Sequence, residues 1–384
     1  MSYFHFWPTV ITIVVVLFIL LHTIAYLILV ERKVSAWAQD RLGPNRVGPW
    51  GLLQPIVDGA KFLLKEDIVP SHVDKIFFIL APAIACGTAL LGFAVIPFGP
   101  TDPSHPEKYQ FVIAPGVDIG FLWTFSISSL AVYGIILGGW SSNSKYSMLG
   151  ALRSSAQIIS YEIPLGLSVL GVVLYSGTLN LERIIAWQTE HGWNVIYQPL
   201  AFLMFLTSIF AECNRLPFDL PEAEQELVGG YHTEYSAIKF GLFFLGEYTH
   251  MITTSFLVSI LFFGGWHFPL LTNGDGWFFV LMKILVIVAK ASFFILFFVI
   301  IRWTLPRFRF DQLMSIAWKI LIPLAVVHLV CVMTIREFQA PLIALTGVSL
   351  VLLIVAGLYA ARRQPPEPVR QTGNIHAPLE EILT

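Results

Sequence analysis

The sequence predicts an all-α polytopic membrane protein. The first observation is composition: 56% of the 384 residues are hydrophobic and only 12% are charged, about half the charged share of a soluble domain. The second is the repeated occurrence of apolar runs of about 20 residues, the length that a helix needs to cross the hydrocarbon layer. These runs are continuous, whereas a membrane β-barrel would show short alternating segments. We therefore expect about nine transmembrane helices.

The first apolar run extends from about residue 7 to 30. It is longer than the apolar core of a signal peptide, no basic residue precedes it and no A-x-A site flanks it, so we expect a retained first span. The further expected spans cover roughly residues 75–97, 119–139, 154–175, 199–214, 236–264, 277–303, 314–335 and 340–361. Residues 1–362 then form a single transmembrane helical domain.

The segment 50–66 differs from the spans in its pattern. A polar stripe at helical spacing is formed by Gln54, Asp58, Lys61 and Lys65, and an apolar face by Leu53, Ile56, Val57, Ala60, Leu63 and Leu64. The segment is too short and too charged to cross a bilayer. We interpret it as an amphipathic helix lying in the interface. The alternative is a helix packed on its own protein, and both alternatives place it at the membrane surface.

The basic residues predict an orientation. If the N-terminus lies outside, most of the 23 lysines and arginines fall in inside segments. Only Lys108, Arg183 and Arg336 fall outside, while Lys283 and Lys290 lie on one face of the seventh span. The positive-inside rule then favours an outer N-terminus and a cytoplasmic C-terminus. The tail 363–384 is rich in proline and polar residues, so we expect a flexible cytoplasmic extension.

Several kinds of site are absent from the sequence. The net charge of −2 argues against nucleic acid as a partner. The three cysteines Cys86, Cys213 and Cys331 are far apart, and without a C-x-x-C or Cys/His cluster the sequence offers no iron–sulfur, zinc or haem-attachment site. It contains no P-loop or dinucleotide fingerprint either. We therefore expect no metal site, no bound cofactor and no catalytic residue in this chain alone, and we interpret the cysteines as packing residues.

Carboxylates within the expected spans are candidates for function, because charges in the membrane are costly. Glu162 lies in the fourth span, Glu212 ends the fifth and Glu247 lies in the sixth. His250 follows Glu247 by three residues, on the same helical face, where the two can exchange a proton. The structural alternative is that each is a polar group bonded to a neighbouring helix. As a set in successive spans, they favour a proton relay.

The stretch 211–235, AECNRLPFDLPEAEQELVGGYHTEY, concentrates acidic residues. Its acids are Glu212, Asp219, Glu222, Glu224, Glu226 and Glu234, against the single strong base Arg215. Glu222 and Glu226 lie four apart and repel each other if the segment is helical. A solvated acidic loop is the alternative, but the alternating apolar residues and the two prolines argue for a packed segment. Buried carboxylates leading to a polar cytoplasmic face fit a proton path without naming a reaction.

Specific strings carry a resemblance to a known family. They are ERKVSAWAQDRLGPNRVGPWGLLQPIVDGAKFLLKE (31–66), ALRSSAQIISYE (151–162), the acidic stretch 211–235, FFLGEYT (243–249) and RWTLPRFRFDQLMSIAWK (302–319). In this order they resemble the quinone-binding membrane subunit of respiratory complex I, a family that includes subunit 1 of the mitochondrial enzyme and its bacterial counterparts. The resemblance covers roughly residues 10 to 335. The ninth span and the tail depart from many family members.

The resemblance implies a subunit of a proton-translocating NADH:quinone oxidoreductase, an enzyme of the translocase class. Quinone, either ubiquinone or menaquinone, would be the substrate and would enter between the first span, the sixth span and the interfacial helix. NADH, FMN and the iron–sulfur clusters would be bound by partner subunits. The implied partners are the peripheral quinone-site and iron–sulfur subunits, the adjacent membrane-arm subunits and the lipid bilayer. The implied location is the bacterial cytoplasmic (inner) membrane.

The resemblance also implies two sets of site residues. The proton-coupling set is Glu162, Glu212, Asp219, Glu222, Glu224, Glu226, Glu234 and Glu247. The quinone-tunnel set is Arg32, Arg41, Arg46, Asp58, Arg302, Arg307 and Arg309. For the arginines, ordinary positive-inside anchoring is the alternative.

Two other functions remain open at this point. One is a related complex whose electrons come from ferredoxin or a deazaflavin coenzyme, because the donor module lies on other chains. The other is a self-sufficient proton-coupled transporter, which internal repeats with broken helices would support. The sequence shows no convincing repeat.

Overall fold

The computed structural model describes residues 6–101, 110–219, 228–269, 271–272, 274 and 276–362, and every regular element in these residues is a helix. The α-helices are α1 (Phe6–Ala38), α2 (Gln54–Leu64), α3 (Lys75–Gly92), α4 (Gly120–Ser141), α5 (Lys145–Ser176), α6 (Leu181–His191), α7 (Asn194–Tyr197), α8 (Pro199–Glu212), α10 (Ala237–Phe263), α11 (Trp277–Thr304), α12 (Phe310–Ile316), α13 (Ile322–Glu337) and α14 (Ile343–Arg362). Shorter turns are η1 (Pro49–Gly51), η2 (Phe93–Val95), η3 (Gly230–His232) and the π-helical η4 (Ala317–Leu321).

The described helices confirm the predicted fold class. Six of them are long and apolar enough to cross a membrane: α1, α3 with η2, α4, α5, α11 and the joined segment from α12 to α13. The shorter helices α8 and α14 are apolar as well. The chain is therefore a multi-pass helical membrane protein. The number of nine spans and the outer N-terminus stay predictions.

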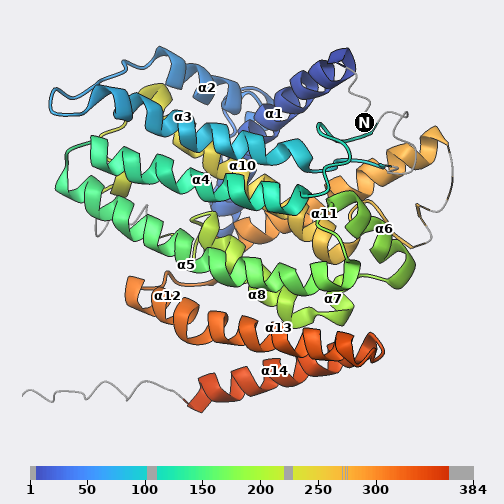
Figure 1. The fold of residues 1–384 in the computed structure, drawn as a ribbon. Coiled ribbons are helices and arrows are strands. Elements are labelled where there is room, and N and C mark those ends of the chain that lie inside the picture. Colours follow the sequence, from blue (N-terminus) through green and yellow to red (C-terminus); the bar gives the residue numbers. More distant parts are fainter. Residues whose placement is uncertain are drawn as a thin grey trace, which may run out of the picture.

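The long helices form a layered bundle in which α3, α4, α5, α13 and α14 follow one another across the molecule (Figure 1). Glycines allow close packing in this bundle: a Cβ on Gly134 of α4 would lie 2.9 Å from the backbone nitrogen of Ala85 in α3. Small residues at helix crossings let membrane helices approach closely. As a result, α4 is held between α3 and α5, where its middle reaches both α5 and α8.

Helix α10 lies at the centre of the bundle, against α3, α8 and α11. All residues from Met251 to Phe262 are buried. Hydroxyl groups in this stretch, such as those of Ser255 and Ser259, donate to carbonyls one turn earlier, which satisfies them without a partner helix. These polar residues, with Glu247 and His250, explain why α10 is not among the six apolar helices although its 27 residues match the expected sixth span.

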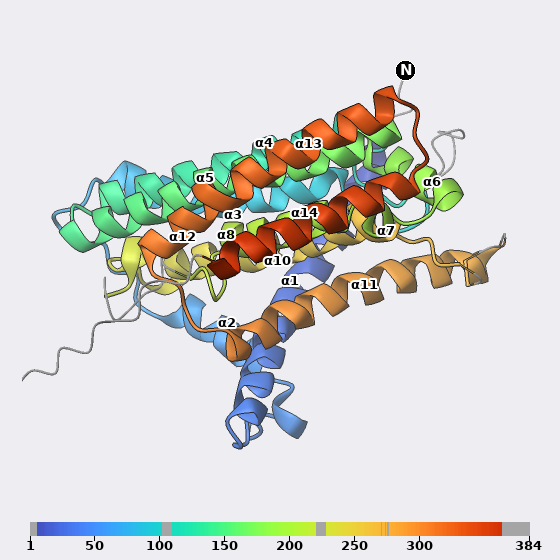
Figure 2. The same cartoon turned by 90° about the horizontal axis from the view of Figure 1, so that it is seen from below.

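Figure 2 shows α1 projecting away from the layer, with α2 near its far end and α11 crossing it. Helix α1 continues to Ala38, beyond the predicted end of the first span near residue 30. The expected first span lies within α1, and its limits stay a prediction. The helix continues through Glu31, which is 5% exposed and is paired with arginines from other segments.

Helix α6 and the polar contacts of α14 were not predicted. Helix α6, which Asn180 caps by accepting from the backbone N–H groups of Glu182 and Arg183, lies in the segment between the fourth and fifth expected spans. Helix α14, the expected ninth span, is attached to the bundle through polar contacts. The Thr346 hydroxyl donates to the Ile196 carbonyl at 2.9 Å, and the Ser349 hydroxyl lies 3.4 Å from Nε2 of the buried His328.

Candidate functional site

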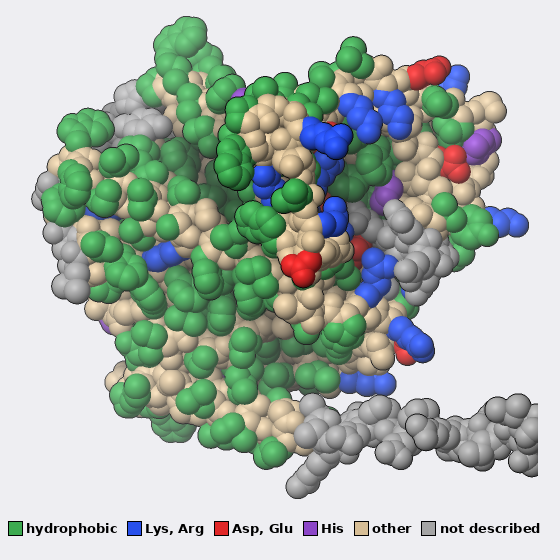
Figure 3. Space-filling view, turned by 180° about the vertical axis from the view of Figure 1, so that it is seen from behind, with side chains coloured by type: hydrophobic (Ala, Val, Ile, Leu, Met, Phe, Trp, Pro, Cys, Tyr) green, Lys and Arg blue, Asp and Glu red, His purple; other side chains and the backbone are tan. Residues whose placement is uncertain are grey.

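A cavity of about 740 Å³ lies between α1, α2, α10 and the end of α11. Its apolar wall includes Leu21, Ile24, Ile28, Phe240, Phe244 and Leu245, and its polar wall includes Glu31, Arg32, Arg41, Gln54, Asp58, Tyr248 and Arg302. Figure 3 shows the side of the molecule on which α1 and α11 lie: it is broadly hydrophobic, with Lys and Arg side chains gathered toward one end. The cavity therefore joins an apolar surface to a charged one.

Helix α2 closes one side of this cavity with its polar face. Asp58 accepts from Arg32 Nη1 of α1 at 2.7 Å and from Gln54 Nε2 at 3.0 Å. No residue of α2 is buried, and its apolar face, including Leu63 and Leu64, is exposed. The structure thus confirms the amphipathic helix, while its position in the membrane interface stays a prediction.

The turn that leads into α2 is held in place from α1. Lys33 Nζ of α1 donates to the Trp50 carbonyl at 2.6 Å. The turn needs glycine at position 51, because φ is +77° there and a Cβ would lie 2.1 Å from the Pro44 carbonyl oxygen. These contacts fix α2 relative to the C-terminal end of α1, where the polar wall of the cavity begins.

A buried arginine connects the cavity to the interior of the bundle. Arg215, just after α8, donates from Nη1 to both oxygens of Glu31, at 3.0 and 3.3 Å. Its Nε lies 3.1 Å from Glu247 Oε1 of α10, and its guanidinium lies 4.3 Å from the centre of the Tyr248 ring. The Tyr248 hydroxyl donates to Glu31 at 2.6 Å, and Arg302 of α11 also pairs with Glu31.

We call this group of Glu31, Arg215, Glu247, Tyr248 and Arg302 the Arg215 network. The Arg215 side chain is 12% exposed and that of Glu31 is 6% exposed. Burial lowers the pKa of Arg215, but Glu247 and Glu31 outweigh this effect and raise it well above its ordinary value. Arg215 is therefore a permanent cation, and the network is neutral when both carboxylates are ionised.

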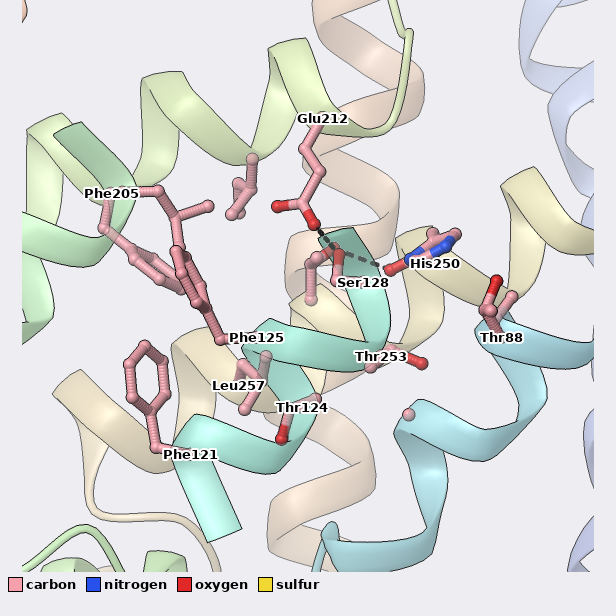
Figure 4. Close-up of a pocket in the computed structure, with 15 residues that line it drawn as sticks. Thr88, Phe121, Thr124, Phe125, Ser128, Phe205, Glu212, His250, Thr253 and Leu257 are labelled. Carbon is pink, nitrogen blue, oxygen red and sulfur yellow. Dashed lines mark hydrogen bonds between the residues drawn. The ribbon is translucent and has the colours of Figure 1, made fainter. Parts of the chain in front are cut away.

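Beyond Arg215, a second and much smaller cavity of about 40 Å³ is lined by Glu247, His250, Glu212 and Ser128. A polar space of this size has room for a water molecule. Glu212 of α8 and His250 of α10 face the same region, and Glu212 accepts a hydrogen bond from Ser128 of α4 (Figure 4). The adjacent Ser129 donates to Glu162 of α5. Glu162, Glu212 and Glu247 are thus gathered around the middle of the bundle.

The predicted residues are only partly brought together. Arg302 joins the Arg215 network, Arg32 and Asp58 form a pair, and Arg41 lines the large cavity. Asp219 pairs with Arg307 Nη2 at 3.0 Å. Arg46 is exposed and Arg309 caps α12, and neither lines the large cavity. Glu234 lines neither of the two cavities described above. Glu222, Glu224 and Glu226 lie outside the described residues.

The structure also places His250 and Lys290, which the sequence analysis singled out. His250 shares a cavity with Glu247, but direct proton exchange between them stays a prediction. Lys290 Nζ donates to the carbonyls of Phe263, Gly265 and His267 at 2.6–2.8 Å, so it caps the C-terminal end of α10. Lysine side chains commonly donate to the carbonyls at the C-terminal end of a helix, so these bonds give Lys290 a structural role.

Four residues of the site, Glu31, Tyr248, Ser128 and Ser129, were not predicted from the sequence. The signal for Glu31 was present, because a carboxylate at the end of an apolar run followed by two basic residues can turn inward as well as outward. Its partner Arg215, however, is 184 positions away in sequence. The serines gave no signal, because small hydroxyl residues are common in membrane helices.

Comparison with known proteins identifies relatives over most of the chain. A family profile described as NADH dehydrogenase matches residues 11–333. NADH-quinone oxidoreductase subunit 8 of Thermus thermophilus is 47% identical over 371 residues, covering 96% of this chain and 97% of the relative. An NADH-quinone oxidoreductase subunit of Cytophaga hutchinsonii is 49% identical, over 78% of this chain and 88% of the relative. An NADH-quinone oxidoreductase subunit of Geobacter metallireducens is 50% identical, over 83% of this chain and 93% of the relative.

Proposed function

This chain belongs to the NADH dehydrogenase family, and we propose that it forms the quinone-access cavity of an NADH-quinone oxidoreductase and transmits protonation changes from that cavity into the membrane. It is a membrane subunit of that enzyme. The names of its relatives support NADH as the electron donor, in preference to ferredoxin or a deazaflavin. NADH, FMN and the iron–sulfur clusters would be bound by partner subunits, in a bacterial inner membrane.

The shape and chemistry of the 740 Å³ cavity support quinone as its occupant. A quinone has a polar head with two carbonyl oxygens and an apolar polyprenyl tail. The wall that α1 contributes also changes from apolar to polar along the helix, from aliphatic residues between Leu21 and Leu29 to Glu31 and Arg32. Tyr248 and Arg302 add hydrogen-bond donors at the polar end. Such a cavity accepts an amphiphile in one orientation, with its head toward the charged end.

The observation that carries the proposal is that Glu31 and Tyr248 belong both to the cavity wall and to the Arg215 network. A change of charge in the cavity therefore acts on a carboxylate that shares one arginine with Glu247. Reduction of quinone to quinol takes up two electrons and two protons, so charge appears at the head group whenever electrons precede protons. Nearby carboxylates respond to such a charge, because like charges disfavour ionisation.

The proposed path then follows the contacts inward. From Glu31 it passes through Arg215 to Glu247, across the small cavity to Glu212, and on to Glu162 beside Ser129. Asp219 and Arg307 lie at the side of this path, where their ion pair holds the segment after Arg215. Glu222, Glu224, Glu226 and Glu234 complete the proposed coupling set, and Arg41, Arg46 and Arg309 complete the tunnel set or contact partner subunits.

A larger side chain in the cavity tests whether quinone occupies it. Ala25 of α1 lines the cavity, and Ala25→Phe adds a ring to that space. We expect KM for quinone to rise about tenfold, consistent with roughly 1–3 kcal/mol for overpacking, while electron transfer from NADH to a water-soluble artificial acceptor is unchanged. Val14→Phe is the matched control, because Val14 is on the same helix, is 61% exposed and lines neither this cavity nor a smaller apolar one nearby. Equal KM values in the two assembled variants would rule out this cavity as the quinone path.

A further inference from the structure

An apolar cavity of about 310 Å³ lies between α1, α10 and α11, beside the first half of α1. Thirteen of its sixteen lining residues are apolar and none is charged. The others are two threonines and a serine, and one of these, Thr12, donates its hydroxyl to the Pro8 carbonyl at 2.8 Å. Such a lining offers no site for an ion or a phosphate, and apolar cavities stay dry. An apolar ligand is the chemistry that fits.

Helix α1 separates this cavity from the larger one. The buried residues in this part of α1 form a single row at a spacing of four: Thr12, Val16, Leu20 and Ile24. The apolar cavity borders one side of this row through Ile19 and Thr23, and the larger cavity borders the other side through Leu21 and Ala25. A void leaves its lining without contacts, so α1 gains packing from any molecule that fills the smaller cavity.

The dimensions of the cavity match a hydrocarbon chain in one leaflet of a bilayer. Its lining residues extend from Ile11 to Thr23 on α1 and from Ile284 to Ile295 on α11. At 1.5 Å per residue, these stretches are roughly 18 and 17 Å long, close to half of the hydrocarbon core of roughly 30 Å. The volume is that of roughly ten methylene groups, when each is given the space of a water molecule in the liquid.

The cavity opens onto the apolar outer surface of α1 and α11. Ile11, Ile19 and Val288 line it and are 59%, 55% and 46% exposed. Both helices are long and apolar enough to cross a membrane, so the recess is continuous with a surface that faces hydrocarbon. A transmembrane helix of a partner subunit is about 10 Å wide, which is too wide for this space. A single chain of the surrounding lipid fits.

We propose that this cavity binds one acyl chain of a membrane phospholipid, with the head group outside the cavity, beyond the N-terminal end of α1. The bound chain acts as a packing partner of α1, which contacts the bundle there through one row of side chains. The polyprenyl tail of a quinone is a different hydrocarbon, and its proposed cavity lies on the other side of α1. The lipid site does not depend on that assignment.

The test uses the whole purified complex in vesicles of phosphatidylethanolamine and phosphatidylglycerol. A small share of the phospholipid carries a photoreactive diazirine in the middle of one acyl chain, and mass spectrometry locates the labelled residues after illumination. We expect labels on Ile252 and Phe256 of α10, which line the cavity and are 2% and 9% exposed. Lipid on the outer surface of the protein does not reach these buried side chains.

A side chain that fills the cavity should displace the lipid chain. Val15→Trp adds an indole ring at a lining position, and Val14→Trp is the matched control, because the adjacent Val14 is 61% exposed and lines neither cavity. We expect labelling of Phe256 to fall about tenfold in Val15→Trp, since a filled cavity resists a further group, and to stay unchanged in Val14→Trp. Val288→Trp fills the cavity from α11 and should give the same loss, with Leu285→Trp as its control.

Three results would overturn the inference. The first is labelling that is confined to exposed residues of α1 and α11, which would show surface lipid only. The second is equal labelling of Phe256 in an assembled filling variant and its control. The third is labelling of Ile252 and Phe256 by a quinone that carries the diazirine on its polyprenyl tail, because the cavity would then belong to the quinone path.

Discussion

Glu31, on the wall of the large cavity, and Glu247, on the wall of the small one, share a buried arginine, whereas Glu212 and Glu162 each meet a serine hydroxyl. The first pair is balanced by fixed cations, since Arg302 also contacts Glu31. The second pair has only neutral partners among the described hydrogen bonds and ion pairs. Arginines therefore neutralise the carboxylates of the first region, whereas no cation among the described residues offsets the charge of an ionised carboxylate in the second.

This difference indicates which substitutions should damage the structure and which should damage proton transfer. Removal of a charge from the Arg215 network leaves its partners buried and unbalanced. Neutralisation of a carboxylate next to a serine removes a proton site but leaves no opposite charge behind. Substitutions in the Arg215 network should therefore lower stability, and substitutions of the serine-bonded carboxylates should lower proton transfer.

Arg215→Met should cause the largest loss of stability. Glu31 and Glu247 would remain buried with one cation fewer, and breaking a buried ion pair in this way costs roughly 3–5 kcal/mol. We expect poor assembly of the complex, or a markedly lower Tm where it assembles. The double variant Arg215→Met with Glu31→Gln should regain part of the loss, because it removes one of the unbalanced charges. Normal Tm in the single variant would show that the network is not needed for stability.

Glu247→Gln should separate stability from coupling. The amide of Gln has the same shape as the carboxylate, and Arg215 keeps its bonds to Glu31, so the complex should assemble. Proton transfer through this position is lost, and we expect coupled quinone reductase activity to fall at least about tenfold. Glu190→Gln is the control, because Glu190 is exposed on α6. Coupled activity equal to that of the control would exclude a relay role for Glu247.

His232, in η3 and within the acidic stretch, provides a pH-dependent test. Burial lowers its pKa from 6.5 to about 4, so it is neutral in the native protein at neutral pH. Between these values the unfolded chain binds a proton that the native state does not, and stability is therefore lost as pH falls from about 6.5 toward 4. His232→Gln should remove roughly 3 kcal/mol of this acid sensitivity, measured as Tm against pH. An unchanged pH profile would mean that His232 titrates normally.

The pair of Arg32 and Asp58 should show the smallest effect. Their side chains are 49% and 25% exposed, so solvent and salt screen the interaction. Asp58→Asn should cost less than about 1 kcal/mol of stability. Its effect should appear as a small change of KM for quinone that disappears at high ionic strength. A loss as large as that of Arg215→Met would show that this pair is as important as the buried network.

The helices were predictable from sequence because long apolar runs have few alternatives in a membrane. The expected spans 119–139 and 277–303 differ from α4 and α11 by at most two residues at either end. The amphipathic segment 50–66 contains α2 for the same reason, since its two faces alternate at helical spacing. Helices α1 and α5 extend beyond the expected spans, α1 to Ala38 and α5 from Lys145.

The site was less predictable, because its geometry depends on contacts between distant segments. Glu162, Glu212 and Glu247 could be recognised as carboxylates in apolar surroundings. The sequence could not show that Arg215 bridges Glu31 and Glu247, or that adjacent serines on α4 face two different carboxylates. Arg309 was assigned to the tunnel from its place in a motif, and that assignment stays a prediction; the structure adds that it is the residue before α12 and that its backbone N–H donates to Gln312.

Proton translocation by the whole complex carrying Glu212→Gln, reconstituted into sealed vesicles, tests whether Glu212 lies on the proton path. On the proposed path, Glu212 connects the small cavity beside Glu247 to Glu162. Glutamine at this position keeps the shape of the side chain and can still accept from Ser128. We expect an assembled complex that oxidises NADH with an artificial acceptor at the normal rate but translocates few protons with quinone. Proton translocation per electron equal to that of the Glu190→Gln control would contradict it.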